Sequence, residues 1–199
     1  MSTTAQISNY YQTLVARDAV IPDPRRTGKT ALAWMADELV IVDEASACVP
    51  QRSDERRLGF GPGELWQSAI VEIDESFLER EYNGVEFVTG RQVFDAGEYD
   101  TRPYCPACNS PVAADAPTLD QWKQALEAWA RGDDRATLEC PTCGQTAPIA
   151  KWRHDPPVGF GNLGLVFWNW PSLNREFIVR LGRAIGYDLM LVEGRRTAS

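Results

Sequence analysis

The chain of 199 residues has few of the features that membrane and catalytic functions require. No apolar run approaches the roughly 18 residues of a membrane-spanning helix. Residues 1–6 lack the basic and apolar regions of a signal peptide. A single histidine, His154, is the only side chain with an ordinary pKa near neutrality. Of the five cysteines, four fall in two close pairs and Cys48 stands alone, which favours a reducing compartment, the cytoplasm.

Basic side chains are also scarce, because 20 lysines and arginines face 28 acidic residues and give a net charge of −8. The acidic excess lies in residues 1–104, which carry ten basic and eighteen acidic side chains, whereas residues 144–199 carry seven and four. Nucleic-acid binding needs a basic surface that neutralises phosphates. The composition therefore disfavours a nucleic-acid partner. A hydrophobic share of 44% with seven tryptophans predicts a folded, globular chain.

Two Cys-x-x-Cys pairs are the most informative feature that is present, namely Cys105-Pro-Ala-Cys108 and Cys140-Pro-Thr-Cys143. Each pair places two thiolates on one tight turn, and two such turns supply the four soft ligands of a tetrahedral Zn²⁺ site. We therefore expect one zinc ion bound by Cys105, Cys108, Cys140 and Cys143. Four protein ligands leave no open position for a water molecule, so we expect the zinc to be structural.

The 31 residues between the two pairs contain a helical pattern. Trp122, Leu126 and Trp129 recur at i, i+4 and i+7, and Gly132 follows as a stop signal, so the spacing predicts a helix over 118–131. The Cys-Pro-x-Cys-Gly sequence resembles the knuckles of zinc-ribbon (rubredoxin-like) domains over residues 104–145. That resemblance implies a structural metal held by four cysteines, although the helical insertion departs from a compact ribbon. The last third of the chain resembles uncharacterised bacterial proteins, with no function attached.

Three alternatives to a structural zinc site remain at the cysteines. A thioredoxin-like redox pair would open a helix after a strand, whereas Pro111 and Pro141 indicate loops. An iron site of the rubredoxin type uses the same four ligands and is the less expected metal. A nucleobase deaminase needs His-x-Glu before its cysteines, and His154 follows both pairs outside such a motif.

The pattern of strands and helices predicts an α+β fold, a mixed sheet with helices, a four-cysteine zinc-knuckle module and a C-terminal βαβ-like unit. We divide the chain into an N-terminal α/β part (1–103), the zinc-knuckle module with its inserted helix (104–145) and a C-terminal strand, helix and strand that complete the α/β part (146–199). Helices are predicted at 4–17, 31–37 and from Pro171 to Gly186. Strands are predicted at 39–42, 69–73, 85–88, 92–94, 163–170 and 187–192, with a glycine turn at 59–63.

Two motifs look like nucleotide sites without meeting the physical requirements of one. Gly28-Lys29-Thr30 lacks the first glycine of a phosphate loop, which is Asp23 here, and no apolar strand precedes it. Residues 159–164 match Gly-x-Gly-x-x-Gly, but they precede a strand, whereas a dinucleotide fingerprint follows a strand and opens a helix. We therefore expect neither ATP nor a nicotinamide cofactor.

Two further groups of residues bear on binding. Trp168 and Trp170 lie two residues apart, so we expect them on one face of a strand, in the core or on a partner surface, with Phe167 on the other face. An acidic cluster consists of Glu72, Asp74, Glu75, Glu79 and Glu81. The cluster either keeps the protein soluble or faces a basic partner.

Three functions are consistent with these features. The first is a non-catalytic cytoplasmic binding protein, with zinc, that acts through protein–protein interaction and neutralises a basic partner in the manner of an immunity protein. The second is an enzyme with an active site on the α/β part, among Asp43, Glu44 and His154. The third is a zinc-ribbon nucleic-acid or transcription accessory factor, which the charge disfavours.

Overall fold

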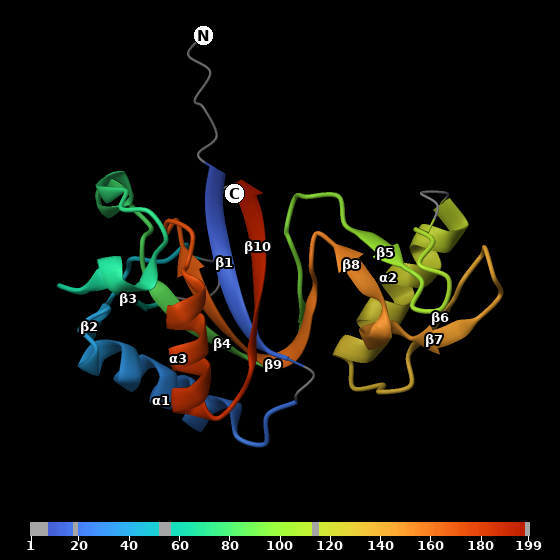
Figure 1. Cartoon of the computed structure of the whole chain (residues 1–199), viewed down its shortest axis with the longest axis horizontal. Coiled ribbons are helices and arrows are strands. Elements are labelled where there is room, and N and C mark those ends of the chain that lie inside the picture. The colour runs from blue at the N-terminus through green and yellow to red at the C-terminus, as the bar shows by residue number, and fades with distance from the viewer. Residues whose placement is uncertain (1–7, 18–19, 52–56, 113–115, 198–199) are drawn as a thin grey trace, which may run out of the picture.

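The computed structural model describes residues 8–17, 20–51, 57–112 and 116–197. Its centre is a six-stranded sheet in the order β10-β1-β9-β4-β3-β2, in which neighbouring strands pair antiparallel. Two helices lie beside the sheet, and a module with the third helix and two small two-stranded sheets lies at the other end of the molecule (Figure 1). The predicted α+β class, a sheet with helices and a cysteine cluster, is confirmed.

The secondary-structure elements follow one another along the chain. The strands are β1 (Ser8–Ala16), β2 (Ile41–Ser46), β3 (Gly59–Pro62), β4 (Val85–Phe94), β5 (Arg102–Tyr104), β6 (Thr137–Glu139), β7 (Thr146–Pro148), β8 (Arg153–Asp155), β9 (Gly159–Trp168) and β10 (Leu189–Thr197). The α-helices are α1 (Pro24–Asp37), α2 (Ala116–Ala130) and α3 (Arg175–Ile185), and the short 3₁₀ helices are η1 (Trp66–Ala69), η2 (Glu75–Glu79) and η3 (Ile149–Lys151).

The main core lies between one face of the sheet and helices α1 and α3. Leu14, Leu165 and Phe167 project from the central strands, and Met35 and Phe177 project from the helices, all of them fully buried. Removing such side chains from water is the largest favourable contribution to folding. This core fixes the position of α3 against the sheet.

The C-terminal helix, predicted from Pro171, begins later, at Arg175, and each of its ends has a local cause. The side chain of Asn174 accepts a hydrogen bond from the Phe177 amide and caps α3, and Gly186 ends the helix in a left-handed conformation. Strands β9 and β10 both pair antiparallel with β1, which lies between them. They therefore run parallel to each other, and β9-α3-β10 is a split form of the predicted βαβ-like unit.

The face of the sheet opposite α1 and α3 is called the curved face, because β1 and β9 bend along their length (Figure 1). Val15 of β1 is fully buried there, and a Cβ on Gly161 of β9 would lie 2.8 Å from its side chain, so only glycine permits this close approach. Beyond β4, Gly97 forms a parallel bridge with Arg195 of β10, which brings the chain round to the opposite edge of the sheet. The curved face is therefore partly closed at the end of β10.

The prediction of a helix over 4–17 is wrong for the residues that the structure describes, because Ser8–Ala16 is the strand β1. Residues 4–7 lie outside the described ranges. Every residue from Tyr11 to Ala16 is buried, since a central strand in this sheet is covered on both faces. Burial on both faces removes the alternation by which a strand is recognised and leaves apolar residues that also fit a helical spacing.

Two predictions in the segment before β4 are also wrong. The glycine turn at 59–63 is largely the strand β3, whose Gly59 packs against the Val49 side chain. The strand expected at 69–73 is not formed, because η1 ends at Ala69 and only an isolated bridge joins Ile70 to Leu173. The two strands expected at 85–88 and 92–94 are the two parts of β4, separated by a break in register between Thr89 and Gln92.

Trp168 and Trp170 do not share a face. Trp168 packs on Tyr11 on the curved face, whereas Trp170 lies on the helical side beside Phe167, with ring centroids 5.5 Å apart. Asn169 between them has a φ of +57°, and this left-handed residue ends the alternation of the strand. Both tryptophans are buried, so neither is available to a partner.

The module has an apolar core of its own around α2. Trp122, Trp129, Leu138, Ile149 and Trp152 are buried together there. The predicted helix at 118–131 is confirmed as α2, which begins two residues earlier, and Gly132 follows it with a φ of +109°. The core includes residues beyond 145, and the domain boundaries at 103 and 145 remain a prediction.

Candidate metal centre

The two cysteine pairs form the same turn twice. In the first, the Cys105 amide donates to the Ser110 carbonyl (3.0 Å) and the Asn109 amide donates to the Cys105 carbonyl (2.8 Å). In the second, the Cys140 amide donates to the Gln145 carbonyl (2.9 Å) and the Gly144 amide donates to the Cys140 carbonyl (2.8 Å).

The fifth residue of each turn is left-handed, with a φ of +56° at Asn109 and +70° at Gly144. Asparagine and glycine are the residues that adopt this conformation at least cost. Each turn thereby exposes one cysteine, Cys108 or Cys143, and buries the other. The local sequence thus forms two matching knuckles.

The fold brings the two knuckles face to face, although they lie far apart in the sequence. The four Sγ atoms lie within 4.8 Å of one another. The Sγ atoms of Cys105 and Cys143 are 3.8 Å apart and those of Cys108 and Cys140 are 3.7 Å apart. Four ligands placed tetrahedrally at about 2.3 Å from one zinc ion have Sγ atoms about 3.8 Å apart. The cysteine group therefore fits the size of a tetrahedral metal site.

The surroundings of the sulfur atoms favour the thiolate at Cys108 and oppose it at Cys143. The hydroxyl and backbone N–H groups of Ser110 lower the pKa of the Cys108 thiol to about 6. At Cys143 the Gln145 amide lowers the pKa, but desolvation and the three neighbouring sulfur atoms outweigh it and raise the pKa to about 12. Four negative charges this close together repel each other, so a bound cation is what allows all four cysteines to ionise.

These residues would hold a metal ion as a cross-link and not as a reagent. When bound, the ion would supply four metal–sulfur bonds that join residues 105–108 to residues 140–143. Cys105 and Cys140 belong to the apolar core of the module, in which Trp122, Trp129 and Trp152 are buried. The cross-link would therefore stabilise this core. A donor set of four thiolates is typical of zinc or of iron.

His154 is part of the module core and is poorly suited to act as a general base. It is 6% exposed, and its Nε2 accepts a hydrogen bond from the Trp122 indole N–H (3.3 Å). Burial lowers the pKa of His154 to about 4, against a small opposing effect of a hydrogen bond with the Trp152 backbone. The side chain is therefore neutral at physiological pH.

The structure does not bring together the three residues considered for an active site. Asp43 and Glu44 are exposed on β2, at one edge of the six-stranded sheet, whereas His154 lies on β8 in the module (Figure 1). A general base must lie within hydrogen-bonding distance of the group it serves. These three residues thus form no common site.

Neither nucleotide-like motif has the geometry of a nucleotide site. Gly28-Lys29-Thr30 lies inside α1, where the Thr30 hydroxyl donates to the Arg26 carbonyl (3.1 Å). Gly28 is needed for packing, because a Cβ there would lie 2.7 Å from the Phe87 ring. Residues 159–164 lie within β9. Neither motif is a loop at the start of a helix, which phosphate binding requires.

Comparisons with known proteins provide no relative from which to infer a function. None of the protein-family models, curated proteins or solved structures compared with the chain matches it. Among the residues that the structure describes, no helix has the length and apolar character needed to cross a membrane.

Two features of functional interest were not predicted from the sequence. One is Asn174, whose side chain donates hydrogen bonds to the carbonyls of Ser68 and Ile70, just before the acidic cluster. The other is a cleft of ≈ 690 Å³ between β10 and the module, lined in part by Lys151 and Arg153. Of the seven basic side chains in residues 144–199, only Lys151 and Arg153 line the cleft, so the basic excess of this segment did not locate it.

Proposed function

We propose that this protein is a non-catalytic, zinc-containing binding protein of the cytoplasm that acts by binding a basic protein partner, as an immunity protein binds a toxin. The observation that carries the proposal is an exposed surface in which apolar side chains lie among carboxylates on a firmly held backbone. The surface is formed by the exposed side chains of segment 71–81, which are the acidic cluster together with Val71, Ile73 and Leu78, and is called the acidic–apolar surface below.

The acidic–apolar surface has the composition of an interface. Val71 is 64% exposed and Ile73 is 69% exposed, so both present most of their apolar area to solvent. All five carboxylates of the acidic cluster are exposed, and the segment 71–81 contains one basic residue, Arg80. Apolar anchors within a charged rim are typical of protein interfaces, and a rim of one sign accelerates association with a partner of the other sign.

The backbone beneath this surface is held in place by α3 and the residues before it. The Asn174 side chain donates hydrogen bonds to the carbonyls of Ser68 (2.9 Å) and Ile70 (3.0 Å). The Val71 amide donates to the Ser172 carbonyl (2.8 Å). These bonds pre-order the segment.

Two buried rings hold the same segment from below. Trp66 packs edge-on against Phe77 with ring centroids 4.9 Å apart, and Phe77 also contacts Trp170 (5.3 Å). A pre-ordered surface loses less conformational entropy on binding, and its affinity rises accordingly. Exposed apolar residues on such a backbone therefore support a role in docking.

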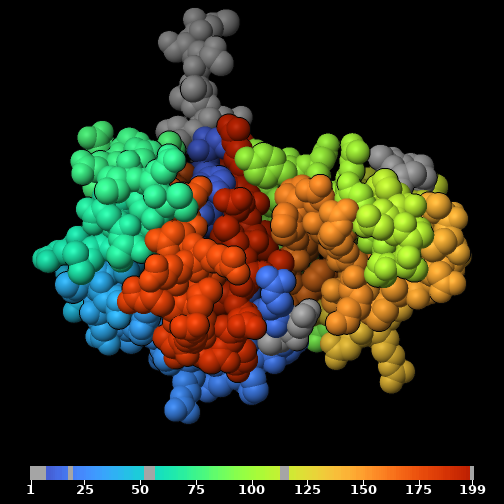
Figure 2. Space-filling model, in the orientation of Figure 1, coloured from blue at the N-terminus to red at the C-terminus, as the bar shows by residue number. Residues whose placement is uncertain are grey.

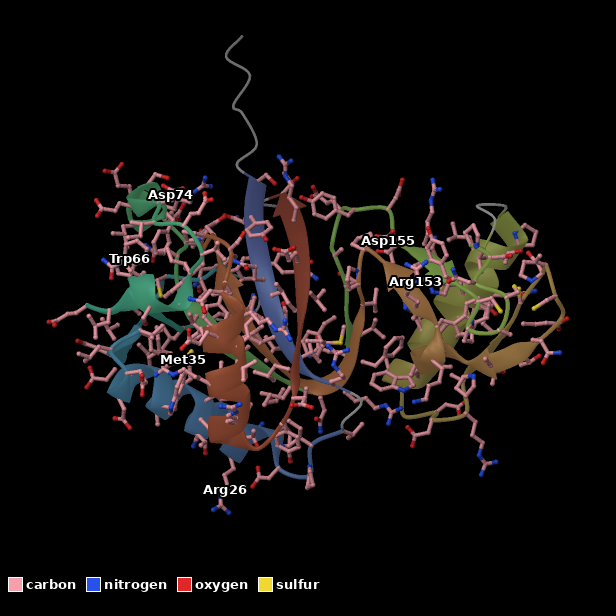
Figure 3. The ribbon with its side chains drawn as sticks, viewed as in Figure 1. Arg26, Met35, Trp66, Asp74, Arg153 and Asp155 are labelled. Atoms are coloured by element: carbon pink, nitrogen blue, oxygen red, sulfur yellow. The ribbon has the colours of Figure 1, made fainter. Side chains whose placement is uncertain are left out.

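The zinc ion has a structural part in this proposal. A site filled by four cysteines leaves no position for a substrate or a water molecule. Four reduced thiolates also suit the reducing cytoplasm. The metal keeps the module folded, and the acidic–apolar surface, at the opposite end of the molecule, makes the contact. Figure 3 shows this separation, with Asp74 and Trp66 far from Arg153 and Asp155.

The proposal is tested by affinity capture from the cytoplasm of the source organism with three forms of the full zinc-loaded chain. The first is wild type, and the second carries Glu72→Lys, Asp74→Lys and Glu75→Lys. The control carries Asp120→Lys, Glu127→Lys and Glu139→Lys, which change the same number of exposed charges on the module.

We expect a basic protein to be retained by wild type and by the control but not by the cluster variant. Its association rate should fall as salt rises, because exposed charges are screened beyond about 8 Å at physiological ionic strength. Ile73→Ser should weaken binding by about tenfold through faster dissociation, since the side chain is an exposed anchor. If the partner is a toxin, co-expression with wild type should suppress its toxicity. Equal retention of one partner by all three forms would refute the proposed surface.

A further inference from the structure

The outer edge of β10 is open over part of its length. β10 is the last strand of the six-stranded sheet, and it pairs with β1 on one side only. At its far end the backbone groups of Arg195 point outward. The Arg195 carbonyl accepts a hydrogen bond from the Glu98 amide (3.0 Å), and the Arg195 amide donates one to the Ala96 carbonyl (3.3 Å). Backbone groups alternate in direction along a strand, so Leu191 and Glu193 also direct theirs outward.

Within the described residues, no strand pairs with the part of this edge that precedes Arg195 in the sequence. None of the described backbone groups bonds to the outward amides and carbonyls of Leu191 and Glu193. Leu189, Met190 and Leu191 are only partly buried. An open edge with apolar side chains is a template for the addition of another strand. The pairing begun by residues 96–98 therefore stops at Arg195, and the edge before it is open.

The cleft of ≈ 690 Å³ meets this open edge at two neighbouring residues. Met190 and Leu191 form its wall on the sheet, and Trp152, Val158 and Phe160 form apolar parts of its wall on the module. Figure 2 shows the hollow between the C-terminal strand and the residues of the module. Five residues of extended chain span roughly 17 Å at about 3.4 Å per residue, the length of the open edge from Leu189 to Glu193.

The charge of the cleft is the reverse of that of the whole protein. Arg17, Lys151 and Arg153 line it, whereas the carboxylate of Asp134 is bonded to Arg91 (2.7 Å) and only Asp155 adds another negative charge. Arg153 is held in position, because its guanidinium lies 3.7 Å from the centre of the Tyr104 ring. An acidic ligand is therefore attracted to the cleft, although the chain has a net charge of −8.

We infer that the cleft binds an extended acidic peptide of a partner protein, which adds as a strand to the outer edge of β10. The backbone groups of Leu191 and Glu193 bond to the peptide backbone. Lys151, Arg153 and Arg17 bind its carboxylates, and the apolar walls hold its alternate side chains. This site is distinct from the acidic–apolar surface and does not depend on the function proposed for that surface.

The test uses the full zinc-loaded chain and random peptides of about nine residues, the usual upper length of a strand, displayed on phage. We expect selection to enrich alternating acidic and apolar sequences. A selected peptide, synthesised with a fluorophore, is then titrated by anisotropy. Hydrogen exchange resolved to single residues should show new protection of the Leu191 and Glu193 amides in the complex, because only strand addition covers these groups.

Two pairs of variants separate the charges from the backbone edge. Lys151→Glu with Arg153→Glu should weaken binding by about tenfold or more, whereas Arg25→Glu with Arg26→Glu on α1 makes the same charge change and should leave binding unchanged. Leu191→Pro removes an outward amide without removing a bond to β1 and should abolish binding, whereas Leu191→Val should retain it. Lys151 and Arg153 are exposed, so their variant tests the proposal even if Leu191→Pro fails to fold.

Several results would overturn the inference. Enrichment of basic residues among the selected peptides, or the absence of any charge preference, is the first. Unchanged exchange of the Leu191 and Glu193 amides in the complex is the second. Binding of a second copy of this chain at the edge, or of small organic anions in place of peptide, would equally contradict it. The inference would be supported independently of the proposed function if the Lys151 and Arg153 variant lost peptide binding but still retained the partner of the acidic–apolar surface.

Discussion

Acidification should destabilise the protein through His154. The side chain is 6% exposed and lies between the rings of Trp122 and Phe160, with ring centroids 6.1 and 5.8 Å away. Protonation would place a charge among these rings and would end the acceptance of the Trp122 N–H by Nε2. The folded protein therefore resists a proton that the unfolded chain accepts.

The size and sign of the effect follow from the two pKa values. Burial lowers the pKa of His154 from 6.5 to about 4 in the folded state. Above about pH 6.5 the ring is neutral in both states and adds no pH dependence. Between about pH 6.5 and about pH 4 only the unfolded state is protonated, so the free energy of unfolding decreases by up to about 1.4 kcal/mol per pH unit. The full loss is about 3 kcal/mol.

The assay is chemical denaturation, followed by tryptophan fluorescence, at several values between about pH 7 and about pH 5.5. Wild type is compared with His154→Gln, which keeps a polar side chain near Trp122 but does not titrate. Protonation of cysteines and loss of metal affect both proteins, so the difference between them isolates His154. As the pH is lowered, the free energy of unfolding of His154→Gln should decrease less steeply than that of wild type. Equal slopes would refute the argument that His154 is buried and neutral.

Two further predictions concern the anchor of the acidic–apolar surface and the metal ligands. Asn174→Ala should lower the free energy of unfolding by about 1–2 kcal/mol, because α3 loses its cap. Asn174→Asp should keep the cap and therefore a thermal stability near that of wild type. A carboxylate cannot donate to the Ser68 and Ile70 carbonyls, so this variant should still show faster hydrogen exchange in that segment. Exchange at the wild-type rate would contradict this. Cys140→Ser should abolish tight metal binding and the near-ultraviolet circular dichroism of the module tryptophans, whereas Cys48→Ser should leave both unchanged. A Cys140→Ser variant with wild-type metal content would show that the group is not the site.

The cysteine turns could be predicted from the sequence because their chemistry is local. Two thiols separated by two residues fit one turn, and Asn109 and Gly144 permit its left-handed corner. The helix between the pairs was predictable for a similar reason, since Trp122 and Trp129 mark one face. Ligand chemistry led us to expect that the four sulfur atoms lie together. The fold places them within 4.8 Å of one another.

Errors arose where tertiary context overrides the local pattern. β1 is buried on both faces, so its apolar residues lost the alternation of a strand and Tyr11 to Ala16 fitted a helix. One left-handed residue, Asn169, was enough to move Trp170 to the face opposite Trp168. No short-range pattern identifies a residue whose conformation is set by distant partners, here the Tyr10 amide and the Tyr82 carbonyl.

The cleft was not predictable because it is assembled from distant parts of the chain. Arg17 precedes α1, Lys151 and Arg153 follow the second knuckle, and Met190 lies on the last strand. In the sequence only the basic character of the C-terminal segment was detectable. Met190 lies on an edge strand because of the sheet order, in which β10 is the terminal strand and neighbours only β1.

Counting the metal ions bound to each chain tests the zinc centre most directly. Native mass spectrometry of the freshly purified protein should show one zinc ion per chain, with Cys105, Cys108, Cys140 and Cys143 protected from thiol reagents. Removal of the ion by a strong chelator should expose these thiols and destabilise the module, since structural zinc contributes roughly 10–16 kcal/mol of apparent binding free energy in finger peptides. A metal-free protein of unchanged stability, with all its thiols reactive, would contradict the account.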